Sequence, residues 1–198
     1  EVFSREDAPV VLGVGKNMVY SIRYWCSAFK VLADDKPTEF GEKLLGDSAW
    51  DPFLEAPASL WLLHWKLLEV PCNATAWYFA FYIFRQVEFS SVELLEALGK
   101  YAETQEIRIA ESSLKKDVLC ILRMYAEPDT NKRRLIEDSI NCPFAELGII
   151  ESGGKGRHYN FRVGSKNNLP PEIVAAACLE FAGRAGEQKT ISISKLCY

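Results

Sequence analysis

The sequence has little histidine and no closely paired cysteines. His64 and His158 are the only histidines among 198 residues, and the six cysteines include no Cys-x-x-Cys pair. A structural zinc site usually takes four Cys or His ligands from such close pairs. The sequence therefore excludes the common zinc-binding modules, and we interpret the cysteines as reduced and mostly buried.

The chain also lacks an excess of positive charge. Its 23 Lys and Arg residues face 27 Asp and Glu residues, which gives a net charge of −4. A chain with this balance carries no basic field over its whole surface that would attract a nucleic acid. Any contact with DNA must therefore come from a local basic patch.

A third absence is a long uninterrupted apolar run. The most apolar stretch, residues 70–84, contains Pro71 and Asn73 and is shorter than the ~20 residues that a membrane-spanning helix needs. The sequence begins at Glu1 without methionine or a secretory signal, so we expect a trimmed form of a longer chain. We expect a cytoplasmic protein with no membrane partner.

Apolar residues at helical spacing are present over most of the chain. They predict helices on both sides of a glycine turn in residues 4–32, and further helices at 58–69, 75–84, 92–103, 114–127, 131–140 and 169–184. Ser90 to Glu93 and Ser112 with Ser113 are the predicted helix caps. Extended runs around residues 152–156 predict a hairpin, and residues 190–194 a further strand.

The order of these elements predicts a mainly α fold with small β-hairpins. We expect two winged-helix or helix-turn-helix-like units joined by buried aromatic helices. The predicted division is residues 1–57 for the N-terminal unit, 58–110 for an apolar helical connector and 111–198 for the C-terminal winged-helix-like unit.

The stretch LGVGKNMVYSIRYW, residues 12–25, contains two glycines and a lysine before an apolar-periodic run. A Walker-type phosphate loop would need glycine at Val10 and a hydroxyl residue at Asn17. The dinucleotide-binding fingerprint would need a third glycine at Met18. Neither phosphate cradle fits this stretch.

The same stretch resembles a helix-turn-helix. Val19 and Ile22 follow Gly13 by the spacing that locks a second helix against the first, although Pro9 departs from the pattern. The face left for solvent suits a groove and its phosphates, and it carries Lys16, Asn17, Tyr20, Ser21 and Arg23. An ordinary core helix with a solvated polar face explains the spacing equally well.

Two further basic patches are candidates for DNA contact. The hairpin sequence GKGRHYNFR places Lys155, Arg157, Tyr159 and Arg162 together, and such a wing would grip phosphate oxygens. His158 in the same hairpin is a candidate catalytic residue, although contact with DNA explains it more simply. The rival patch at the start of a predicted helix consists of Lys132, Arg133 and Arg134.

Carboxylates four residues apart, Asp47, Asp51 and Glu55, form the best acidic cluster for phosphodiester cleavage. Such chemistry commonly uses Mg²⁺ on clustered carboxylates, and Asp47 and Asp51 are the candidate ligands. Loop solubility and helix capping by Asp51 or Glu55 explain the cluster as well. His64, between Leu63 and Trp65, is interpreted as a hydrogen-bonded core histidine.

Several blocks of the sequence together resemble one bacterial family. These blocks are LGVGKNMVYSIRYW, TEFGEKLLG, WDPFLE, LWLLHWKLL, SSLKKDV and CPFAELGII, in this order between residues 11 and 196. They are similar to the bacterial domain-of-unknown-function family four-thousand-and-seven. The resemblance implies a role in DNA phosphorothioation beside a cysteine desulfurase, an ATPase and a sulfur-transfer protein, but it supplies no catalytic motif.

Two functions follow as expectations. In single-strand phosphorothioation systems, the resemblance implies a DNA nickase that opens the backbone for sulfur insertion. The alternative is a DNA-binding adaptor without catalytic activity, which forms a homodimer through its aromatic helices and recruits the sulfur-transfer partners.

Overall fold

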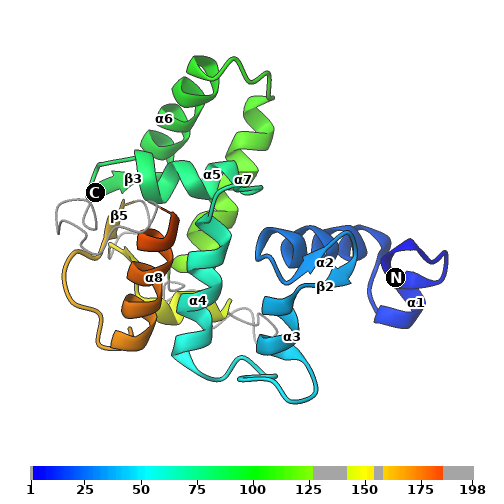
Figure 1. Cartoon of the computed structure of the whole chain (residues 1–198). Coiled ribbons are helices and arrows are strands. Elements are labelled where there is room, and N and C mark those ends of the chain that lie inside the picture. The colour runs from blue at the N-terminus through cyan, green and yellow to red at the C-terminus, as the bar shows by residue number, and fades with distance from the viewer. Residues whose placement is uncertain (1, 127–141, 154–157, 185–198) are drawn as a thin grey trace, which may run out of the picture.

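The computed structural model describes residues 2–126, 142–153 and 158–184, and these residues form a mainly helical protein with two small antiparallel sheets (Figure 1). The helices are α1 (Ala8–Leu12), α2 (Lys16–Ala28), α3 (Glu39–Leu45), α4 (Pro57–Leu68), α5 (Thr75–Tyr78), α6 (Ser91–Thr104), α7 (Glu111–Tyr125) and α8 (Pro171–Arg184). Shorter turns are η1 (Val2–Ser4), the π-helical η2 (Phe79–Ile83) and η4 (Pro143–Leu147). The predicted fold class, mainly α with small hairpins, is confirmed.

The strands are β1 (Leu32–Ala33), β2 (Lys36–Pro37), β3 (Glu88–Ser90), β4 (Ile150–Ser152) and β5 (His158–Phe161). The predicted helix at 131–140 and the predicted strand at 190–194 lie outside the described residues.

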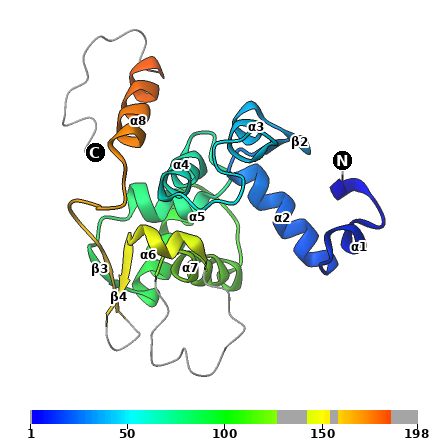
Figure 2. The same ribbon diagram turned by 90° about the horizontal axis from the view of Figure 1, so that it is seen from below.

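Helix α1 and the start of α2 project away from the other helices (Figures 1 and 2). Gly13 ends α1 in the left-handed conformation, with φ at 65°, which glycine adopts without steric penalty. Pro9 lies in the first turn of α1, where a missing backbone N–H interrupts no hydrogen bond. Val19 is buried on the inner side of α2, as the helix-turn-helix spacing predicts.

The far end of α2 packs into the body of the protein. The Trp25 ring meets the Trp77 ring edge to face at 5.0 Å, and the Phe29 ring stacks on Phe144 at 5.3 Å. Each such aromatic pair contributes about 0.5–1.5 kcal/mol beyond the area that it buries. These contacts fix the direction in which α2 leaves the body.

A tight hairpin, β1 and β2, connects α2 to α3. Asp34 and Asp35 at its tip both have positive φ, at 50° and 61°, as the two-residue turns that match strand twist require. Thr38 then caps α3, because its hydroxyl oxygen accepts the Gly41 N–H at 2.9 Å.

One hydrophobic cluster joins α2, α3 and α4 to α7, η4 and β4. Residues 77–84 form a block rich in aromatic side chains. In this block Trp77 and Phe79 are each 4% exposed, whereas Tyr82 and Ile83 at the end of η2 are each 38% exposed. The block is therefore core at Trp77, Phe79 and Phe84, with Tyr82 and Ile83 exposed between the last two.

A three-stranded antiparallel sheet with the order β3-β5-β4 lies beside this core. Phe89 of β3 pairs with Tyr159 of β5, and Ser152 of β4 pairs with the same Tyr159. Helices α6 and α7 come between β3 and β4 in the chain. The sheet thus joins residues of the predicted connector to residues of the predicted C-terminal unit.

The two predicted helix caps have different outcomes. Ser90 and Glu93 form a full capping box at the start of α6, as predicted. The predicted cap at Ser112 and Ser113 is wrong, because α7 begins at Glu111 and its N-cap residue is Ala110. A carboxylate at the first helical position stabilises the positive end of the helix dipole and favours this earlier start.

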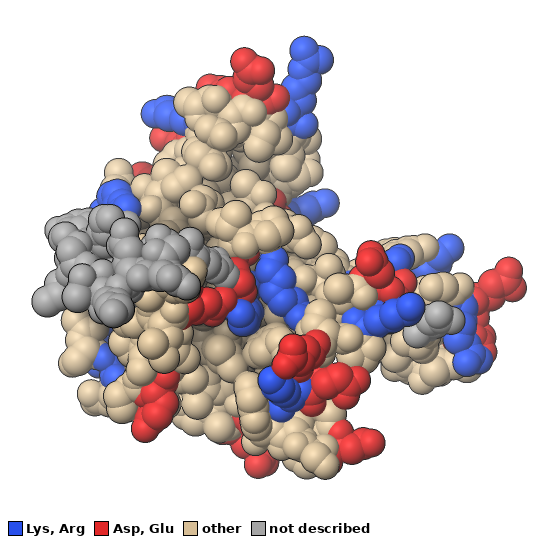
Figure 3. Space-filling model, in the orientation of Figure 1, with Lys and Arg blue, Asp and Glu red and all other residues tan. Residues whose placement is uncertain are grey.

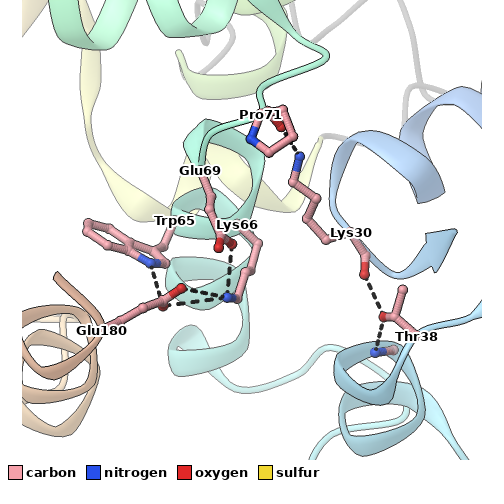
Figure 4. A network of polar contacts seen from close by, with 8 residues as sticks. Lys30, Thr38, Trp65, Lys66, Glu69, Pro71 and Glu180 are labelled. Atoms are coloured by element: carbon pink, nitrogen blue, oxygen red, sulfur yellow. Dashed lines mark hydrogen bonds and ion pairs between the residues drawn. The ribbon is translucent and has the colours of Figure 1, made fainter. Parts of the chain in front are cut away.

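Helix α8 is held against α4 by charge (Figure 4). Lys66 Nζ lies 2.9 Å from Glu69 Oε2 and 3.2 Å from Glu180 Oε1. Trp65 Nε1 donates to Glu180 Oε2 at 3.1 Å. On the other side of α4, Lys30 Nζ donates to the Pro71 carbonyl and Thr38 donates to the Lys30 carbonyl at 2.6 Å.

Two expectations about composition can be compared with the described residues. Cys26, Cys72, Cys120, Cys142 and Cys178 are all free thiols, as expected, but each is half-buried, so the expectation of burial is wrong for these five. Among the helices of the described residues, none has both the length and the apolar character needed to cross a bilayer.

Candidate nucleic-acid interface

The face of α2 that is predicted to contact DNA is open to solvent. Lys16, Asn17, Tyr20, Ser21 and Arg23 are all exposed, and the Ser21 hydroxyl donates to the Asn17 carbonyl at 3.1 Å. A helix that projects from the body with this face exposed has the shape needed to enter a groove. Contact of these residues with DNA stays a prediction.

The charge on this face is mixed. Arg23 Nε lies 2.6 Å from Asp35 Oδ1, and the Asp35 side chain is only 13% exposed. Asp35 therefore neutralises Arg23, whereas Lys16 has no ion pair with another described residue. Figure 3 shows Lys and Arg interspersed with Asp and Glu over this part of the surface.

The predicted wing lies at β4 and β5. Arg162 Nε is 3.6 Å from Glu151 Oε1, and both side chains are about half exposed. The Tyr159 ring stacks on Phe89 at 6.0 Å, which makes Tyr159 part of the sheet's packing. Lys155 and Arg157 between the strands, and Lys132, Arg133 and Arg134 of the rival patch, lie outside the described residues.

His158, the candidate catalytic residue of the hairpin, is exposed at the start of β5 and pairs with Ser90 of β3. It lies near the capping box of α6. The pKa of Glu93 is lowered mainly by the Ser90 hydroxyl and backbone, with a smaller contribution from the charge of His158. A catalytic role of His158 stays a prediction.

Asp51 of the acidic cluster is engaged in structural hydrogen bonds. Asp51 Oδ1 accepts the Glu55 N–H at 3.0 Å and Oδ2 accepts the Ala56 N–H at 2.9 Å. These bonds, with one from the Ser59 side chain as the largest cause, lower the pKa of Asp51. Among the described residues, no group of three or more His, Cys, Asp and Glu could hold a metal ion. Asp51 thus orders the entry to α4, and binding of Mg²⁺ by Asp47 and Asp51 stays a prediction.

His64 is a hydrogen-bonded core histidine, as expected. Its Nδ1 lies 2.9 Å from the Tyr125 hydroxyl, and the rings of Phe81 and Tyr125 meet it edge to face at 4.9 and 5.3 Å. Burial lowers the pKa of His64 to about 4. The residue is therefore neutral at physiological pH and contributes to packing.

The structure reveals a basic surface that sequence reasoning missed. Lys115 and Lys116 are exposed in the first turns of α7, while Leu114 and Val118 beside them are buried. Cations near a helix N-terminus oppose the helix dipole, and this local conflict was the signal that could have drawn attention to them. An anion that contacts them would relieve it.

The fold and these surfaces define a mainly helical protein with a projecting N-terminal helix pair and a small sheet flanked by α6 and α7. A family model described as "Protein of unknown function (DUF4007)" matches residues 1–198. The chain belongs to this family, as its sequence blocks suggest.

Two solved structures are similar to the chain. A crystal structure of SspB is 40% identical, with a TM-score of 0.83, and a crystal structure of magnesium ion-bound SspB is 40% identical, with a TM-score of 0.82. In both comparisons the similarity covers 93% of this chain and 58% of the SspB chain. Among curated proteins, none matches this chain.

Proposed function

We propose that this chain is the DNA-binding part of a component of a bacterial single-strand DNA phosphorothioation system. The observation that carries the proposal is the similarity to SspB over 93% of the chain at 40% identity. The family resemblance supplies the link to backbone sulfur insertion in DNA. The DNA-binding role is supported by the surfaces described above.

The first support is the exposed face of α2. Its polar side chains stand on a helix that is anchored at its other end by Trp25 and Phe29. On such a helix Lys16 would contact a phosphate and Asn17 a base edge, whereas Arg23 is paired with Asp35.

The second support is the topology of the three-stranded sheet. Its strands have the order β3-β5-β4, and α6 and α7 lie between β3 and β4 in the chain. In a winged helix, a first strand precedes two helices, and the next two strands form the wing and pair with it. The chain follows this order, so we assign β4 and β5 to the wing. Lys115 and Lys116 then lie on the helix that would face DNA.

A salt titration of DNA binding tests the proposal. Each phosphate contact contributes roughly 0.9 to the slope of log affinity against log salt on B-DNA. We expect Lys16→Glu and the pair Arg157→Glu with Arg162→Glu each to weaken binding and flatten this slope. Lys43→Glu is the control, since Lys43 already pairs with Glu39 on α3 at 2.6 Å. Unchanged slopes in both test variants would refute the DNA-binding role.

Within this proposal, the first candidate activity is nicking of duplex DNA. It is supported by the family resemblance and by the magnesium ion-bound state of the similar SspB. The second candidate is an adaptor that dimerises and recruits sulfur-transfer and ATPase proteins. It is supported by the engagement of Asp51 in backbone hydrogen bonds, which leaves the strongest acidic candidate with a structural role.

A supercoiled-plasmid assay with the full-length protein separates the two candidates. Nicking predicts an open-circular product in Mg²⁺ that is lost in EDTA. The adaptor hypothesis predicts that the plasmid is retarded on a gel but stays supercoiled in both Mg²⁺ and EDTA. Sedimentation of the same protein tests the expected homodimer.

A further inference from the structure

A cavity of about 210 Å³ lies where the N-terminal helix pair meets the body. It is bounded by α2, by the segment that leads into α5, by α6 and by α7, and Tyr24, Trp77, Tyr101, Ile107, Leu114 and Asp117 are among the residues that line it. Sites for drug-sized ligands usually enclose about 300–1,000 Å³. This cavity is therefore of a size for one side chain or a small organic molecule.

The walls of the cavity are held by the core. Trp77 and Leu114 are 4% and 8% exposed, and Trp77 Nε1 donates to Met124 Sδ at 3.3 Å. The Tyr24 hydroxyl, also in the lining, donates to the Asn73 carbonyl at 3.2 Å. Because both aromatic walls are fixed by their own contacts, the cavity is preformed rather than opened by a ligand.

Asp117 is the one charged side chain in the lining. It is half-buried, and it makes no hydrogen bond or ion pair with another residue in the part of the chain that the structure describes. Burial raises the pKa of its carboxyl above the ordinary value, and burial, followed by the charge of Asp117, raises the pKa of the Tyr24 hydroxyl. A carboxylate in apolar surroundings is stabilised chiefly by a cation that comes to it.

The lining selects the chemical class of the ligand. Aromatic faces attract cations, the aliphatic side chains of Ile107 and Leu114 suit a hydrocarbon stem, and Asp117 supplies the counter-charge. Lysine and arginine are absent from the lining. A phosphate or nucleotide would therefore meet the like charge of Asp117 and find no cationic side chain.

We propose that this cavity binds an aliphatic organic cation, with Asp117 as counter-ion and Tyr24, Trp77 and Tyr101 as aromatic walls. A lysine or arginine side chain of a partner protein and a free alkylamine share this chemistry. None of the lining residues is among the proposed DNA contacts, so the two proposals are tested independently.

The test uses two probes of nearly the same shape, N-butylguanidinium and N-butylurea, which differ in charge. Binding to the whole chain is followed by NMR through the Trp77 indole N–H and the amides of Tyr101 and Asp117. We expect the cation to bind at least about five-fold more tightly than the urea. Equal binding of the two probes, or shifts confined to residues outside the lining, would overturn the proposal.

Two variants locate the charge preference. Asp117→Asn removes the counter-ion and should reduce the preference for the cation to below about two-fold. Glu111→Gln is the matched control, because Glu111 is an exposed carboxylate at the start of α7 and is not in the lining. If Asp117→Asn keeps the preference, or if Glu111→Gln loses it, Asp117 is not the counter-ion and the proposal fails.

A second comparison distinguishes the sources of the cation. Agmatine represents a free amine, and a blocked pentapeptide with a central arginine represents a protein side chain. Tighter binding of the peptide identifies a partner protein, and tighter binding of agmatine identifies a free ligand. Adenosine is included as well, and tighter binding of adenosine than of both cations would overturn the assignment.

Discussion

His64 and Tyr125 share a hydrogen bond of 2.9 Å between Nδ1 and the phenolic oxygen, across 61 residues of sequence. It ties α4 to the end of α7 inside a ring of aromatic side chains. The pair makes the stability of the fold depend on pH.

Stability should fall in acid because of His64. Burial places its pKa at about 4, below the ordinary value of 6.5, so the unfolded chain binds the proton more readily. The stabilisation is complete above pH 6.5 and is lost as the pH falls toward 4, by up to about 3 kcal/mol. Urea unfolding at pH 7, 5.5 and 4.5 measures the loss.

The variant His64→Gln isolates this contribution, since carboxylates also titrate over part of the range. We expect it to be less stable than wild type at pH 7 but to lose less stability on acidification. His158→Gln is the control, because His158 is exposed. A wild-type pH dependence that survives in His64→Gln would contradict the assignment.

Tyr125→Phe should destabilise the protein at neutral pH. The Tyr125 ring is fully buried, and the change removes only the hydroxyl. His64 Nδ1 then lacks its hydrogen-bond partner, which costs about 1–3 kcal/mol. Thermal unfolding of the variant beside Tyr159→Phe, on the sheet, tests the prediction, and equal melting temperatures for the two would count against it.

Asp51→Ala should lower stability, because it removes a carboxylate that orders the loop before α4. Its carboxylate accepts two backbone N–H groups at the entry to α4. Asp47→Ala, at an exposed position of the same loop, should leave stability unchanged. A similar loss in both variants in urea would show that Asp51 has no special role.

Glu180→Gln should loosen α8. Glu180 accepts from Trp65 and Lys66 of α4, and the amide keeps the side-chain shape without the charge that Lys66 contacts. We expect amide hydrogens in α8 to exchange several-fold faster, with little change in α7. Glu172→Gln, exposed in the first turn of α8, is the control. Unchanged exchange in Glu180→Gln would mean that apolar contacts hold the helix.

Local sequence signals predicted the local structure well. The Ser90–Glu93 capping box, the turn at Gly13 and the burial of Val19 all depend on residues within a few positions of one another. Strand β3 was missed because three residues, Glu88 to Ser90, become a strand only by pairing with β5, 70 residues later.

The candidate sites were harder to predict than the elements. The exposed face of α2 follows from helical spacing, but the pairing of Arg23 with Asp35 depends on a hairpin that turns back beside the helix. Similarly, Asp117 and Tyr24 meet in one cavity although 93 residues separate them. Local periodicity gives the direction of a side chain and not the distant residue that it meets.

Helix α2 contains 13 residues without an internal glycine or proline, a rod of about 20 Å. Its two ends move together because no joint interrupts it. A tilt imposed at Lys16 would therefore move Tyr24 and Trp25, and the Trp25 ring contacts the indole of Trp77. The outer end of α2 is thus linked through a rigid helix to the wall of the cavity.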